Sequence, residues 1–139
     1  KMEVTFTKEE TIKLIEEYYK RLEDREVTAS ISSKKGYTGW QDEEGCVTTI
    51  TVSERMEIAG MEKEVKEIIT TDQLTTLLRA VFELYEFDLT SVAISDGLNS
   101  RWEGYGYNEH EVKSAYCKGI TVNVNKKKNH SLGKRPNNI

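Results

Sequence analysis

The chain has 139 residues and a net charge of −4, a length that fits one compact domain with a real core. Hydrophobic residues make up 37% and charged residues 32%, and no apolar run approaches the ~20 residues that a membrane-spanning helix needs. Residues 1–5 contain an acid and no apolar run, so they do not predict a signal peptide. These features and two widely spaced cysteines predict a cytoplasmic protein, without a membrane partner, whose thiols stay reduced.

The net charge is unevenly distributed along the chain. Residues 126–139 contain five basic residues and no acid, which leaves 15 basic against 24 acidic residues, a net charge of −9, in residues 1–125. We therefore expect a single α+β domain over 1–125 and a basic, solvated and flexible tail over 126–139, although such a tail has the charge to attract phosphate. An acidic body repels the nucleic-acid backbone, so a nucleic acid is not the expected partner.

The first expected element is a helix from Thr7 to about Asp24. Thr7 and Glu10 have the spacing of a capping box, in which each residue's side chain bonds the other's backbone N–H. Four apolar residues then recur at helical spacing on one face: Ile12, Ile15, Tyr19 and Leu22.

Strand patterns follow this helix. Residues 27–32 alternate between apolar and polar side chains, residues 34–45 form a polar, glycine-containing hairpin tip, and a second strand begins near Cys46 and continues to Ile58. Ala59 and Gly60 predict a turn. Residues 61–70 share the alternation of a third strand, but their many Glu and Lys residues also favour a helix, so both assignments stay open.

The second helix is predicted from a Thr70–Gln73 cap and a continuous apolar stripe, which contains Leu74, Leu77, Leu78, Val81, Leu84 and Tyr85. Phe82 lies off the centre of this stripe, so it either flanks the core or presents its ring at the margin. Strands at 89–95 and 119–125 complete the pattern, with a short helix near 108–111. The resulting αβββαββ order predicts the α+β class, with two helices packed on a mainly antiparallel sheet of about five strands.

A loop predicted over 96–108 concentrates aromatic, glycine, arginine and asparagine residues between two predicted strands. Aromatic planes stack on bases, and arginine and amide groups bind phosphates or ribose hydroxyls. The candidate ligand-binding residues are Phe82, Asn99, Arg101, Trp102, Tyr105 and Tyr107.

The same residue types serve two other roles. Trp, Tyr and Arg are the commonest hot-spot residues of protein interfaces, so the segment is also a candidate subunit or partner contact. A purely structural alternative places Trp102 and one tyrosine in the mouth of the sheet and pairs Arg101 with Glu103 or another acid. Tyr37 and Trp40 have similar chemistry and are candidates for a second wall of the site, or for the partner half in a dimer.

Catalytic and metal-binding patterns are weak, so no catalytic residue, metal site or cofactor is assigned and the protein is not expected to be an enzyme. There are only two histidines, and the 24 acids are too many to single out an acid–base pair. Glu109, His110 and Glu111 are adjacent in the sequence, and adjacent helical side chains cannot converge on one ion. Gly104-Tyr105-Gly106 lacks the rest of a nucleotide-binding fingerprint.

In size, acidity and the predicted helix-first αβββαββ order, with segments such as 7–24 and 71–87, the chain resembles the small counter-defence proteins of Firmicutes bacteriophages. Among these it resembles the Thoeris anti-defence sponges, with anti-CRISPR proteins as the nearest alternative. The sponge resemblance implies a non-enzymatic homo-oligomer in the host cytoplasm that sequesters a cyclic ADP-ribose-type molecule in pockets built partly at subunit contacts. Phe82, Arg101, Trp102 and Tyr105 are chemically suited to such a ligand. The anti-CRISPR resemblance implies an inhibitor that contacts a basic host defence protein.

Overall fold

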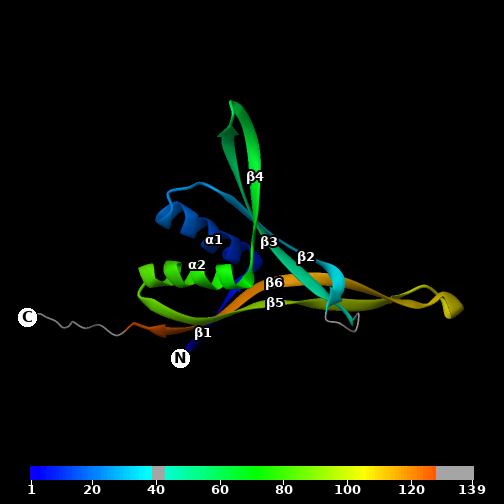
Figure 1. Cartoon of the computed structure of the whole chain (residues 1–139). Helices are drawn as coiled ribbons and strands as arrows, with labels where there is room; N and C mark the ends of the chain where they lie inside the picture. The colour runs from blue at the N-terminus through cyan, green and yellow to red at the C-terminus, as the bar shows by residue number, and fades with distance from the viewer. Residues whose placement is uncertain (39–42, 128–139) are drawn as a thin grey trace, which may run out of the picture.

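The computed structural model describes residues 1–38 and 43–127 of the chain. Its elements in chain order are β1 (Met2–Thr7), α1 (Lys8–Leu22), β2 (Thr28–Thr38), β3 (Glu43–Ile58), β4 (Met61–Ile69), α2 (Thr71–Leu84), β5 (Phe87–Glu103), the short 3₁₀ helix η1 (Gly106–Asn108) and β6 (His110–Lys126). The strands form two antiparallel three-stranded sheets, with the orders β1-β6-β5 and β2-β3-β4. Figure 1 shows α1 and α2 side by side over the first sheet.

The α+β class is confirmed, but the strand number and order were predicted wrongly. The described residues contain six strands in two sheets, where about five strands in one sheet were expected, and β1 precedes α1. The helix-first order that contributed to the phage resemblance is therefore not present. The open segment 61–70 contains strand β4, because residues 61–69 pair with β3 from Ile58 back to Ile50. The expected short helix near 108–111 is instead η1 followed by the start of β6.

Both helices begin where their capping boxes predict. The Thr7 hydroxyl accepts a hydrogen bond from the Glu10 N–H at 3.1 Å, and the Thr7 N–H donates to the Glu10 carboxylate at 2.9 Å. Thr70 and Gln73 make the same reciprocal pair at the start of α2, at 3.2 and 2.8 Å. Two backbone N–H groups that a helix start leaves unpaired are thus satisfied in each case.

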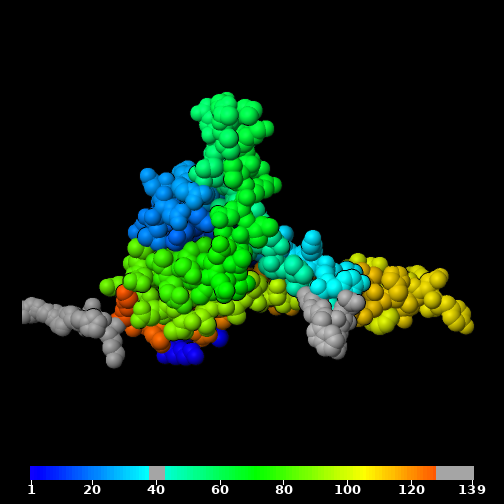
Figure 2. All heavy atoms as spheres, viewed as in Figure 1, coloured from blue at the N-terminus to red at the C-terminus, as the bar shows by residue number. Residues whose placement is uncertain are grey.

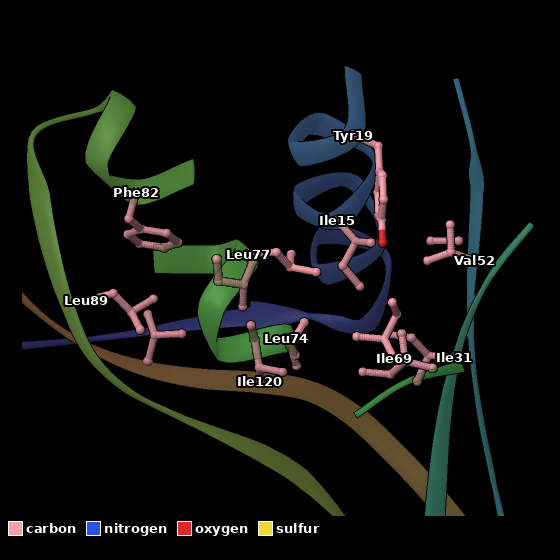
Figure 3. Close-up of a cluster of buried hydrophobic side chains, with 14 of the residues drawn as sticks. Ile15, Tyr19, Ile31, Val52, Ile69, Leu74, Leu77, Phe82, Leu89 and Ile120 are labelled. Carbon is pink, nitrogen blue, oxygen red and sulfur yellow. The ribbon is translucent and has the colours of Figure 1, made fainter. Parts of the chain in front are cut away.

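The core lies where the two helices meet the roots of both sheets (Figure 3). Ile15 and Leu74 are fully buried and come from α1 and α2, and Ile120 comes from the central strand β6. Ile31, Val52 and Ile69 bring the second sheet into the same cluster. Burial of these side chains is the main favourable contribution to folding and fixes the helices against both sheets.

Two long hairpins continue beyond the core as two-stranded ribbons (Figures 1 and 2). In the first sheet, β1 pairs with β6 only as far as Gly119, so residues 96–117 of β5 and β6 pair only with each other; we call them the β5–β6 ribbon. In the second sheet, β2 pairs with β3 only as far as Ser53, and we call residues 54–66 the β3–β4 ribbon. Residues 96–103, which are most of the predicted loop 96–108, therefore belong to strand β5.

Candidate functional site at the end of the β5–β6 ribbon

The aromatic residues of segment 96–108 lie in water at the end of the β5–β6 ribbon. The exposed fraction is 66% for Trp102 and 92% for Tyr105, and Tyr107 is fully exposed. Tyr105 and Tyr107 belong to the six-residue connection between the strands, where η1 turns the chain. These side chains therefore do not fill the mouth of the sheet, which was one alternative from the sequence.

The strand geometry separates the polar candidates from Trp102. Asn99 pairs with Ser114, Arg101 with Val112, and Trp102 with Glu111, without an irregularity in this stretch. Because successive side chains of a strand point to opposite faces, Asn99 and Arg101 share one face of the ribbon and Trp102 lies on the other. A single chain thus brings Asn99 and Arg101 together but does not place the indole and the guanidinium on one flat site.

Arg101 is paired with an acid of its own strand. Its Nε and Nη2 both lie 2.7 Å from the carboxylate of Glu103, as one of the alternatives from the sequence had it. Both side chains are exposed, and exposed ion pairs contribute little to stability, about 0–1 kcal/mol. An incoming carboxylate or phosphate would have to compete with Glu103 for Arg101.

Phe82 lies in the core and does not join the ribbon residues. Its ring is 8% exposed and packs edge-on against Phe6, with the ring centroids 5.8 Å apart. Figure 1 shows α2 at the opposite end of the first sheet from the ribbon end, and Figure 3 shows the ring pointing into the core. Phe82 also lines an apolar hollow of about 390 Å³ between α1 and α2, with Leu14 and Tyr85 in its wall.

Residues 44–48 of β3 lie against the ribbon face that carries Trp102. Lys113 pairs with Glu44 at 3.4 Å, the Thr48 hydroxyl donates a hydrogen bond to Asp96, and Cys46 Sγ lies 3.6 Å from the carbonyl oxygen of Tyr116. Both cysteines are free and half-buried. These contacts join residues about 50 to 70 positions apart, so no local pattern in the sequence indicates them.

Tyr37 faces the same junction. It lies opposite Glu44 on the hairpin, while Trp102 lies one same-face position beyond Lys113 on the ribbon. The Glu44–Lys113 pair therefore has an exposed tyrosine on one side and an exposed tryptophan on the other. Trp40, the other aromatic residue predicted for this wall, lies outside the described residues.

The start of β6 has no converging arrangement of metal ligands. Glu109, His110 and Glu111 follow one another at and just before the start of the strand, and His110 Nδ1 lies 3.0 Å from the carbonyl oxygen of Asn108. Over residues 1–38 and 43–127, no group of three or more His, Cys, Asp or Glu side chains is arranged to hold a metal ion. Within the same ranges, neither helix has the length and apolar character that crossing a membrane requires.

Comparison with known proteins finds no relative: no protein-family model, curated protein or solved structure matches this chain. The fold and the site define an α+β protein with two projecting β-ribbons, one of which ends in exposed aromatic side chains. Because a fold alone does not determine a function, the geometry and chemistry of the ribbon end are the basis for assigning one.

Proposed function

We propose that the protein is a non-catalytic binding protein that contacts another protein through the aromatic end of the β5–β6 ribbon. The observation that carries this proposal is the exposure of Trp102, Tyr105 and Tyr107 together at the end of a projecting ribbon. Each such side chain can bury about 150–250 Å² in a contact. Tryptophan and tyrosine dominate the energetics of protein interfaces, because each buries a large apolar surface on binding and keeps a polar group that can form a hydrogen bond.

The charge of the ribbon argues against a nucleic acid as the partner. Residues 96–117 contain four acids, Asp96, Glu103, Glu109 and Glu111, against Arg101 and Lys113. Both of these cations are already paired with a carboxylate. Binding to a phosphate backbone depends on unpaired cations that release condensed counterions. A protein with basic residues around an apolar contact fits the ribbon better.

The shape of the ribbon end favours a macromolecule over a small nucleotide. Sites for small molecules are concave and enclose most of the ligand, whereas Tyr105 and Tyr107 are almost entirely surrounded by water. A nucleotide-sequestering protein of the sponge kind would need a second chain to close a pocket around these residues. The counter-defence role stays a proposal, and its protein-inhibitor form, an acidic protein against a basic effector, agrees better with this surface.

Affinity capture tests the proposal. The native protein, a Trp102→Ala Tyr105→Ala Tyr107→Ala variant and a Tyr85→Ala control would be immobilised and incubated with lysate of the cells that produce the protein. Tyr85 is an exposed tyrosine at the end of α2, far from the ribbon end. The control therefore also replaces an exposed aromatic side chain by alanine, but outside the proposed contact. Bound proteins and heat-released small molecules would then be identified by mass spectrometry.

We expect a protein that binds the native chain and the Tyr85→Ala control but not the triple variant, with the far-ultraviolet circular dichroism unchanged in all three. If the triple variant retains the same proteins as the control, the proposal is wrong. If the native chain instead releases a stoichiometric nucleotide-like molecule that is missing from the triple variant, sequestration of a small molecule replaces the proposal.

A further inference from the structure

The β3–β4 ribbon has one apolar face and one charged face. Opposite residues of an antiparallel pair share a face, so Met56, Ile58, Met61 and Val65 lie together on one side. All four are exposed, Ile58 to 51% and Met61 to 54%. The other side carries the ion pairs Arg55–Glu62, at 2.8 Å, and Lys66–Glu64, at 3.8 Å. One side of this ribbon is therefore suited to contact with water, and the other is suited to burial.

The apolar face continues the core without a break. Ile50, Val52 and Ile69 have the same strand phase as Met56 and Val65 but are buried against the helices. Just beyond Ser53, Arg25 reaches this face and pairs with Glu54 at 2.7 Å. From Met56 to the end of the ribbon the apolar side chains are exposed, and Figure 2 shows the end of the ribbon standing clear of α1. A two-stranded ribbon is marginally stable alone in water, so burying this face would stabilise it.

A recess lies at the root of the same face. It has a volume of about 320 Å³ between β4 and the helices, with Tyr19, Ile69 and Leu77 among its walls. Its lining contains the acids Glu23, Glu67 and Asp72 and no base, and one of these acids, Glu23, is already paired with Arg25 at 3.0 Å. Nearer the end of the ribbon, the apolar face carries one cation, Lys63, which lies opposite Met56.

We propose that the apolar face of the β3–β4 ribbon is a homodimer interface, in which each ribbon packs antiparallel across the other. With the two-fold axis at Val65, residues equally distant from Val65 meet across the axis, so Lys63 of one copy lies opposite Glu67 of the second. The end of each ribbon, with Met61, then enters the acidic recess of the other copy. One surface thus supplies both halves of an isologous contact.

The charge pattern indicates that a second copy of the chain binds in the recess. The recess requires an apolar segment with a nearby cation, and the ribbon end offers Met61, Ile58 and Lys63 in that combination. Two of the three methionines of the chain lie at this end, and methionine adapts its shape to the surface that it fills. This interface is distinct from the aromatic end of the β5–β6 ribbon and does not depend on the function proposed for it.

The first test compares two isoleucines on opposite faces of the second sheet. Ile58→Asp puts a charge into the proposed interface, whereas Ile68→Asp changes a somewhat more exposed isoleucine that pairs with Thr51 on the other face. By light scattering coupled to size exclusion, we expect a dimer for the native chain and for Ile68→Asp, and a monomer for Ile58→Asp. A monomeric native chain, or a dimer that survives Ile58→Asp, would overturn the proposal.

The second test exchanges charges and does not depend on the apolar contacts. Lys63→Glu alone puts two acids opposite each other, and Glu67→Lys alone puts two lysines opposite each other, so each should weaken its own dimer at least about 10-fold. In a mixture of the two variants, both opposed pairs of the heterodimer have opposite charges. We expect the mixture to form a dimer of native affinity, measured by analytical ultracentrifugation. If the dimer affinity of the mixture is as low as that of either variant alone, the pairing of Lys63 with Glu67 across the interface is ruled out.

Discussion

The two ribbons leave the same core but differ in how their apolar side chains are arranged. On the β3–β4 ribbon, the exposed aliphatic residues gather on one face, and the ion pairs Arg55–Glu62 and Lys66–Glu64 lie on the other, so the first face is the one suited to burial. On the β5–β6 ribbon, polar residues line both faces and the exposed aromatic residues gather at the end. An apolar face fits a broad, self-complementary contact, whereas exposed aromatic side chains at an end fit insertion into a partner.

The ribbons also differ at their structural weak points. The β3–β4 ribbon closes with Ala59 and Gly60, both at positive φ, in a two-residue turn. The β5–β6 ribbon is joined to the core by a bulge, where Ser95 pairs with Gly119 and Asp96 with Cys117, so Lys118 has no opposite residue. Gly119 has a φ of 134° there, and a Cβ would overlap the carbonyl oxygen of Phe6 in β1.

The largest expected effect is on stability, at this bulge. Gly119→Ala introduces an unfavourable φ and a clash with backbone atoms, so we expect a loss of about 3 kcal/mol in the free energy of unfolding. Gly60→Ala meets no atom within 4 Å and should cost only the left-handed backbone penalty, about 1 kcal/mol. Urea unfolding at equal protein concentration measures both. Equal losses would mean that the bulge does not constrain the ribbon.

A smaller effect is expected where the β2–β3 hairpin meets the β5–β6 ribbon. Asp96→Ala removes the carboxylate that accepts from the half-buried Thr48 hydroxyl, which keeps its contact with Ser33 Oγ at 2.6 Å, and should cost about 1 kcal/mol. Glu62→Ala, the control on the β3–β4 ribbon, removes only an exposed ion pair and should cost at most about 0.5 kcal/mol. If the control costs as much as Asp96→Ala in the same urea titration, the junction does not hold the ribbon.

The smallest expected effect is a pH dependence at the recess beside the β3–β4 ribbon. A hydrogen bond to Glu23, at 2.9 Å, and burial raise the pKa of the Tyr18 hydroxyl above its ordinary value of 10.0. The folded state therefore favours the neutral phenol, and this contribution to stability is complete below pH 10.0 and is lost as the pH rises through the folded-state pKa. Tyr18→Phe should make the loss of stability above pH 10.0 shallower. An unchanged slope would contradict this account.

The helices could be predicted from the sequence because their signals are local. Thr7 with Glu10 and Thr70 with Gln73 are capping boxes at fixed spacing, and the stripes that follow reflect burial on one face. The β3–β4 segment was ambiguous because Glu and Lys dominate β4, and only pairing with β3 makes it a strand. Strand β1 was missed because its partners, residues 119–124, lie at the other end of the domain.

The candidate site was predictable in composition but not in geometry. The aromatic residues of 96–108 indicated a contact surface, and their exposure agrees with that hypothesis. The ribbon itself was missed because polar residues lie on both of its faces, so its sequence has no regular apolar alternation. Phe82 was assigned to the site by chemistry alone, whereas its packing against Phe6 places it in the core.

The most direct measurement is site-specific photo-crosslinking from the two ribbons in cells that produce the protein. A photoreactive amino acid would replace Tyr107 in one variant and Ile58 in another, and the products would be identified by mass spectrometry. We predict that the Tyr107 position forms an adduct with a different protein, and that the Ile58 position forms an adduct of twice the chain mass. If Tyr107 crosslinks only to a second copy, or to no protein, the aromatic end of the β5–β6 ribbon is not the partner surface proposed for it.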